Sequence, residues 1–111
     1  MLCCHHPACF EVTGTSLLCR LHRKHLTKHQ RKKFRNMWHD IIRDKSKLEN
    51  GYVMCFHCER PFPWGETCGD HFPRTVGSRK DLEFDIMNGQ ATCKSCNRSD
   101  NPNRKDPKEF T

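Results

Sequence analysis

The sequence has 111 residues, enough for roughly one domain, and 34% of them are hydrophobic, below the roughly 45–50% of ordinary globular chains. Nine cysteines and a formal net charge of +7 indicate a chain stapled by metal ions or disulfides that binds a polyanion. No run approaches the roughly 18 apolar residues of a membrane span, and the amino terminus lacks the layout of a signal peptide. We therefore expect a cytoplasmic protein with reduced thiols and no membrane partner, in which clustered cysteines bind metal.

Cysteines and histidines crowd the first segment, residues 1–22. Their spacing is compatible with a Cys3His zinc site, and we expect its ligands to be Cys4, Cys9, Cys19 and His22. The first ligand stays open because three competing side chains lie beside it, namely Cys3, His5 and His6. The alternative is a reduced amino terminus whose cysteines bind nothing.

The second segment, residues 23–50, has helical periodicity. Apolar residues recur at steps of three and four, and Asn50-Gly51 provides a stop signal. We expect one long basic amphipathic helix whose apolar face packs on the following segment, with a dimer seam as the alternative. The residues of that face are Phe34, Met37, Trp38, Ile41 and Ile42.

The first half of this helix is strongly cationic, because no acidic residue occurs between Glu11 and Asp40. Such a positive surface favours nucleic-acid binding over the alternative of a merely solvated face. The cations that we assign to nucleic-acid binding are Arg23, Lys24, Lys28, Arg31, Lys32, Lys33 and Arg35.

Two Cys-x2-Cys pairs, at Cys55/Cys58 and Cys93/Cys96, bracket the third segment, residues 51–100. This spacing lets both thiolates of a pair reach one tetrahedral zinc, so the two pairs predict one shared structural site. The alternatives are two separate half-sites, or His57 in place of one cysteine. The pairs are 34 residues apart, longer than the roughly 15–20 of a simple zinc ribbon, so a further substructure must lie between them.

An Asp-His dipeptide, Asp70-His71, lies between the pairs, Asn88 precedes the second pair, and Asn97 follows it directly. This order resembles the HNH endonucleases, whose fold is a ββα-metal finger, and is most similar to the phage recombination endonuclease VII and NinG-like group. The resemblance covers about residues 55–98 and implies a small α+β, zinc-stapled fold, with a helix that begins just after the second cysteine pair. Asn97 stands where many relatives carry His.

The resemblance also implies roles for these residues. His71 would be the general base, Asp70 and Asn97 would hold one catalytic Mg2+ or Mn2+ ion, and Asn88 would fix the loop that carries His71. Oxygen ligands suit such hard cations, and a histidine titrates near neutral pH. The cations Arg74, Arg79 and Lys80 surround the motif and are expected to contact phosphates.

We therefore expect a metal-dependent DNA endonuclease that hydrolyses phosphodiester bonds, active in the host cytoplasm if phage-encoded. One alternative is a zinc-stabilised nucleic-acid-binding or adaptor protein without catalysis. Another is a protein that binds a host enzyme and inhibits it or changes its activity. A homodimer and a phage or host protein partner also remain open. The last segment, residues 101–111, is expected to be a flexible tail.

Overall fold

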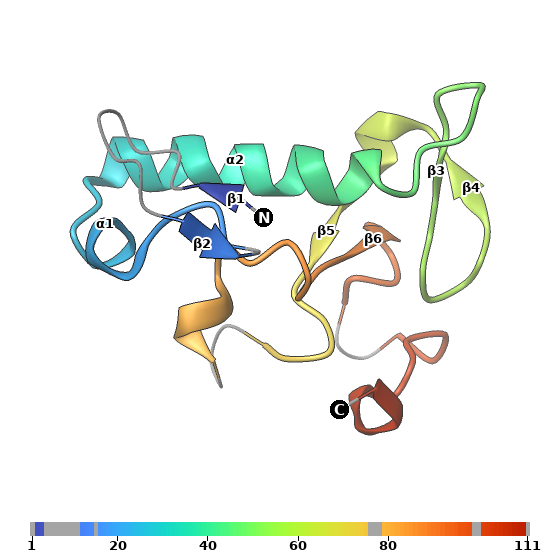
Figure 1. The fold of residues 1–111 in the computed structure, drawn as a ribbon. Coiled ribbons are helices and arrows are strands. Elements are labelled where there is room, and N and C mark those ends of the chain that lie inside the picture. Colours follow the sequence, from blue (N-terminus) through green and yellow to red (C-terminus); the bar gives the residue numbers. More distant parts are fainter. Residues whose placement is uncertain (1, 4–11, 15, 76–78, 99–100, 111) are drawn as a thin grey trace.

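The protein has an α+β fold, shown as a computed structural model in Figure 1, which describes residues 2–3, 12–14, 16–75, 79–98 and 101–110. The α-helices among these residues are α1, Arg20–Lys24, and α2, Lys28–Asp44. None of the described helices is long and apolar enough to cross a membrane. The described strands form antiparallel pairs, which are β1 (Leu2–Cys3) with β2 (Val12–Gly14), β3 (Val53–Met54) with β4 (Pro61–Phe62), and β5 (Thr67–Asp70) with β6 (Gln90–Cys93).

The cationic segment is two helices instead of the single helix expected over 23–50. A capping box starts α2 afresh: the Thr27 hydroxyl accepts a hydrogen bond from Gln30 N at 3.1 Å, and Thr27 N donates to Gln30 Oε1 at 3.0 Å. These bonds satisfy two backbone donors that would otherwise lack a partner at a helix start. The sequence Thr-x-x-Gln therefore separates α1 from α2.

The end of α2 also differs from the expectation, because the helix stops at Asp44, well before Asn50-Gly51. Gly51 instead forms a turn in which its N–H donates to Leu48 O at 3.0 Å, and its φ of 86° lies in the left-handed region that favours glycine. The Asn-Gly signal was therefore a turn signal, and it sits in the connection that leads to β3.

The hydrophobic core lies between α2 and the loops around β5 and β6. Phe34, Trp38 and Ile42 are buried, as the periodicity predicts, and they pack with three residues from other segments: Leu17, Leu18 and Phe84. Met37 and Ile41 are partly buried against this cluster. The expected apolar face of α2 is thus confirmed, but it packs on the first segment as well as on the third. Figure 1 shows β5 and β6 below the second half of α2.

Two glycines allow α2 to approach the strands this closely. A Cβ atom at Gly69 would lie 2.7 Å from Trp38 Cζ3, and one at Gly89 would lie 2.5 Å from Ile42 Cδ1. Both distances are shorter than van der Waals contact, so larger residues would push the helix away. These glycines set the distance between α2 and the β5–β6 pair.

The motif residues lie at or near the ends of the β5–β6 pair. Thr67 lies opposite Cys93 and Asp70 opposite Gln90, so Asp70 ends one strand where the other begins. The helix expected after Cys96, as the α element of a ββα finger, is not among the described elements; the chain makes a single turn there, with Asn97 N donating to Cys93 O at 3.1 Å. The following Asn101-Pro102 disfavours a helix, because proline restricts the residue before it and lacks an N–H.

The described part of the last segment contacts the third segment, residues 51–100, instead of extending freely as a flexible tail. Lys105 N donates to His57 Nδ1 at 3.0 Å, and the Arg104 guanidinium donates to Cys96 O at 3.4 Å. The Lys105 ammonium lies 4.5 Å from the centre of the Phe56 ring. Polar and cation–π contacts therefore hold a segment whose composition predicted disorder.

Candidate functional site

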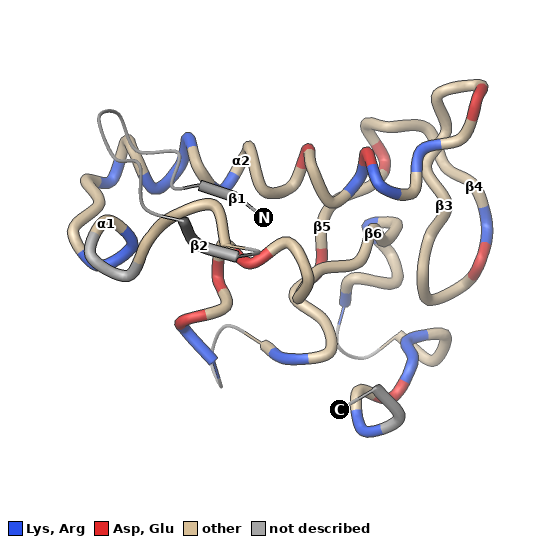
Figure 2. Tube along the Cα trace, in the orientation of Figure 1, with Lys and Arg blue, Asp and Glu red and all other residues tan. Residues whose placement is uncertain are grey.

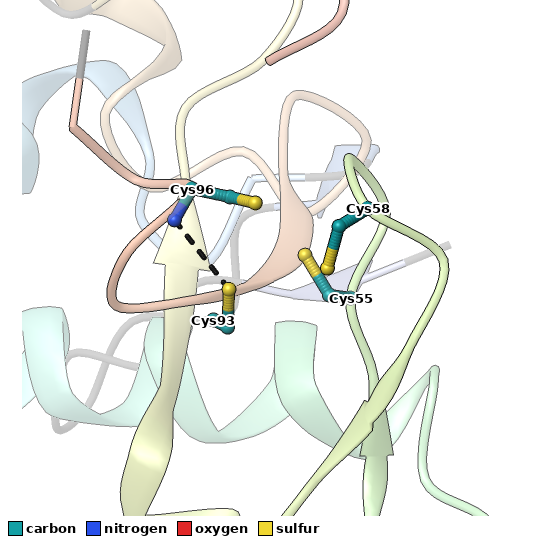
Figure 3. Close-up of side chains that lie close together, drawn as sticks. All are labelled: Cys55, Cys58, Cys93 and Cys96. Atoms are coloured by element: carbon teal, nitrogen blue, oxygen red, sulfur yellow. Dashed lines mark hydrogen bonds between the residues drawn. The ribbon is translucent and has the colours of Figure 1, made fainter. Parts of the chain in front are cut away.

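Four cysteine side chains converge beside the end of β6. The Sγ atoms of the four lie within 4.8 Å of one another, and Figure 3 shows the two pairs facing each other across a small gap; they are Cys55, Cys58, Cys93 and Cys96. Sulfurs around a tetrahedral zinc lie roughly 3.8 Å apart, as follows from bonds of about 2.3 Å. The cluster can therefore hold one metal ion, which confirms that the two pairs share a site.

The thiols of this cluster have unequal acidities. Burial alone would raise the pKa of Cys55, yet hydrogen bonds from the backbone of Cys58 and Cys93 outweigh burial and lower it to about 6. Burial raises the pKa of Cys58 and also that of Cys96. A metal ion that binds the cluster must therefore displace protons.

His57 is not directed to the cysteines, although the sequence left it open as a replacement ligand. Its ring is buried between two other partners, accepting from Lys105 N at Nδ1 and lying 3.1 Å from Asp70 Oδ2 at Nε2. Because Nδ1 accepts a hydrogen bond, Nε2 carries the ring proton and donates to the carboxylate. His57 therefore orients Asp70.

The motif residues Asp70, His71 and Asn97 line one cavity of about 490 Å³. These three residues, which are spread over 28 positions of the sequence, therefore lie around the same cavity. The cavity is completed by side chains and backbone from α2, β5 and the following loop, namely Arg35, His39, Gly69, Thr75 and Glu83. We refer to this cavity as the cleft.

The ring of His71 is held in a defined orientation. Its Nε2 lies 2.8 Å from Glu83 O, and the ring stacks on Trp38 with a centroid distance of 4.1 Å and an interplanar angle of 8°. A carbonyl oxygen only accepts, so Nε2 carries the proton and Nδ1 keeps its lone pair. His71 can therefore accept a proton at Nδ1.

Asp70 is buried, with 8% of the residue exposed, and its carboxylate has a cationic partner. Arg104 approaches Oδ2 at 2.9 Å and Oδ1 at 3.3 Å. Asp70 and Asn97 supply oxygen donors on the same cleft, a donor set that fits a hard divalent cation. Arg104 is thus a competitor of such an ion for the carboxylate.

Asn88 is buried and does not reach the cleft. Its side-chain amide accepts from Arg74 N at 3.1 Å and donates to Arg74 O at 2.8 Å. This pair of bonds fixes the backbone three residues after His71. The arrangement agrees with a role in holding the loop that carries His71.

Two of the four expected ligands of the second zinc site, Cys19 and His22, lie among the described residues. Cys19 Sγ and His22 Nδ1 are 3.1 Å apart at the start of α1. Cys4 and Cys9, the other expected ligands, lie outside the described residues. The two placed side chains have the spacing of a local Cys-x2-His pair.

A larger cavity of about 890 Å³ lies next to the cleft, and both are lined by Arg35 and Glu83. Figure 2 shows the Lys and Arg positions along α1 and the first half of α2. We call this second cavity the basic groove. Its cations are five of the ten that the sequence assigned to nucleic-acid binding: Arg23, Lys24, Arg31, Arg35 and Lys80.

The remaining assigned cations do not line either cavity; they are Lys28, Lys32, Lys33, Arg74 and Arg79. Arg79 forms an ion pair with Asp81 at 2.8 Å, which lowers the pKa of that carboxyl to about 2. Within the groove, Arg31 pairs with Glu83 at 2.8 Å. Ion pairs with acidic residues therefore hold the side chains of Arg31 and Arg79 in place.

Three residues of the site were missed by the sequence reasoning: His39, His57 as a partner of Asp70, and Arg104. His39 lies on the polar side of a helix, where an isolated histidine carries no signal. Arg104 lies in a segment of disordered composition. Only His57 had a usable signal, because it sits within a metal-binding pair.

Comparison with known proteins identifies no relative: no family model, curated protein or solved structure matches this chain.

Proposed function

We propose that this chain is a metal-dependent DNA endonuclease of the HNH type, stabilised by one structural zinc ion at the four cysteines. The observation that carries the proposal is the shared cleft, in which Asp70, His71 and Asn97 face one volume beside the cysteine cluster. A protein that only binds DNA has no need for a base and two oxygen ligands in one place.

The orientation of His71 supports its role as general base. With Nε2 donating to Glu83 O, the free Nδ1 takes a proton from a water molecule. The water oxygen forms a bond to phosphorus, the bond from phosphorus to the leaving sugar oxygen breaks, and that oxygen takes a proton from solvent. Stacking on Trp38 and the Asn88 contacts keep the ring in place during this step.

Asp70 and Asn97 would hold the catalytic Mg2+ or Mn2+ ion, which would stabilise negative charge on the phosphate. His57 keeps the Asp70 carboxylate oriented through its Nε2–H. The basic groove next to the cleft fits the backbone of a nucleic acid, since its cations lie within one cavity that shares Arg35 with the cleft.

The test is nicking of supercoiled plasmid by zinc-loaded protein, with and without added Mg2+ or Mn2+. We expect cleavage that requires the added ion and that His71→Ala abolishes, while His29→Ala, an exposed histidine of α2, cleaves like the wild type. Zinc content and thermal unfolding of each variant show that it is folded. Equal cleavage by His71→Ala and wild type would overturn the proposal.

The second candidate function is a DNA-binding or adaptor protein without catalysis. The Arg104–Asp70 ion pair favours it, because a carboxylate already neutralised by arginine is a poorer metal ligand. Under this reading the folded protein binds DNA, yet wild type and His71→Ala are equally inert on duplex, branched and single-stranded substrates.

A further inference from the structure

We propose that His39 is a second histidine of the catalytic site, whose Nε2–H donates a hydrogen bond to a non-bridging oxygen of the scissile phosphate. The inference rests on the proposed function and deepens it, because it assigns a substrate contact to a residue outside the Asp70, His71 and Asn97 motif.

The first observation is a hydrogen bond that determines which nitrogen of His39 is protonated. Gly69 N donates to His39 Nδ1 at 2.9 Å. Nδ1 therefore has no proton, and the neutral ring carries its proton on Nε2. A Cβ atom at Gly69 would lie 3.0 Å from Nδ1, so the absence of a side chain there permits this contact.

The second observation is that His39 lines the cleft together with Asp70, His71 and Asn97. None of the described residues accepts a hydrogen bond from Nε2, and Arg43 Nε is the only buried, unpaired side-chain nitrogen or oxygen among them. Nε2–H is therefore an open donor on a half-buried side chain. The cleft offers this donor to whatever it binds.

Burial and the charges around His39 disfavour the charged form of its ring. Burial lowers the pKa of His39, and the neighbouring His71, Arg43 and Arg35 lower it as well, against the opposing charge of Asp40. A neutral donor beside Arg35 suits the oxygens of a phosphodiester. The charged ring is also disfavoured by the Gly69 N–H that points at Nδ1.

The two histidines of the cleft present opposite chemistry. His71 offers a lone pair at Nδ1, and His39 offers a proton at Nε2. Hydrolysis of a phosphodiester uses one group that accepts the proton of water and another that stabilises the charged phosphoryl oxygens. Trp38 stacks on His71 while the adjacent His39 bonds to β5, so α2 orients both rings.

Two substitutions separate this role from a structural one. In His39→Asn the amide oxygen can take the place of Nδ1 and accept from Gly69 N, but no donor remains at the Nε2 position. In His39→Gln the amide nitrogen can take the place of Nε2, but the acceptor for Gly69 N is lost. The matched control is His29→Asn, which makes the same change at an exposed position of α2.

The experiment measures single-turnover plasmid nicking, duplex binding by fluorescence anisotropy without Mg2+, and zinc content. We expect His39→Asn to cleave more slowly by a factor on the order of 10², as for loss of one donor to a charged transition state. Its zinc content and unfolding temperature should match the wild type. His39→Gln should keep a rate within about fivefold of the wild type. If His39→Gln cleaves more slowly than His39→Asn, the inference is wrong, and the role of His39 is to hold β5 through its bond to Gly69 N.

A second readout distinguishes failure of this inference from failure of the proposed function. In protein labelled with ¹⁵N-histidine, the His39 Nε2 resonance should shift when a short DNA duplex is added without divalent ions. If the wild type never cleaves but this shift occurs, the nuclease proposal fails and His39 remains a phosphate ligand. If the wild type cleaves, no shift occurs and His39→Asn is as fast as the wild type, only the His39 inference fails. If the wild type neither cleaves nor shows the shift, both fail.

Discussion

The cysteine cluster and the cleft both include residues of the β5–β6 pair but are built in different ways. Each half of the cluster is a local turn, in which two thiols three residues apart face the same point. The cleft is assembled from α2, β5, the loop after His71 and the turn after Cys96. A local site depends on its own ligands, whereas an assembled site also depends on the core that brings distant segments together.

The largest expected effect is at the cluster. Cys93→Ser removes a ligand, and because structural zinc contributes about 10–16 kcal/mol in small zinc domains, we expect loss of bound zinc and of the folded state. The measurement is zinc content together with circular dichroism. Cys68→Ser, a half-buried cysteine outside the cluster, is the control and should keep both. Retention of zinc and structure by Cys93→Ser would show that the fold does not depend on this site.

A core substitution tests how far the cleft depends on α2. Trp38→Ala should destabilise the protein by roughly 3–5 kcal/mol, because it empties a fully buried position and removes the bond from Trp38 Nε1 to Asp85 O at 2.9 Å. It also removes the ring that stacks on His71. Urea unfolding with excess zinc gives the change in stability, and Tyr52→Ala, which truncates an exposed aromatic, should cost far less.

A pH series tests the acidity of the cluster. Zinc binds thiolates, and the raised pKa values of Cys58 and Cys96 keep both protonated near pH 7, whereas Cys55, at about 6, is already ionised. Binding therefore releases at least two protons, and zinc affinity falls as the pH falls, by a factor of at least about 10² for each pH unit. Competition with a chromophoric chelator at pH 8 and pH 7 measures this. A pH-independent affinity would contradict the assigned protonation states.

The smallest effect concerns the ion pair that joins the cleft to the last segment. Arg104→Gln removes the cation that holds the Asp70 carboxylate, so we expect tighter Mn2+ binding by up to about tenfold, equivalent to about 1.4 kcal/mol. Calorimetry or Mn2+ electron paramagnetic resonance on zinc-loaded protein measures the affinity. Arg60→Gln, an exposed arginine with the same change in charge, is the control. Weaker Mn2+ binding by Arg104→Gln would mean that Arg104 supports the ion site instead of competing for it.

Local patterns were enough to predict several features. The two Cys-x2-Cys pairs predicted a shared metal site, and the three- and four-residue steps predicted the buried face of α2. The ends of that helix were missed, because the Thr27 capping box and the turn at Gly51 decide them. The segment after Asn97 was expected to continue a finger helix, and its single turn reflects the polar, proline-containing sequence that follows.

The sequence by itself determined the local features, because thiol pairs, an apolar helix face and the Asp70-His71 dipeptide are each recognisable over a few positions. Only the tertiary structure decided what surrounds them. His39 meets Gly69 across 30 positions and Arg104 meets Asp70 across 34, contacts that no periodicity encodes. The His39 contact arises because the packing of Trp38 against Gly69 and Gly89 sets the distance between α2 and the strands. The Arg104 contact arises because the last segment folds back and bonds to Cys96 O and His57 Nδ1.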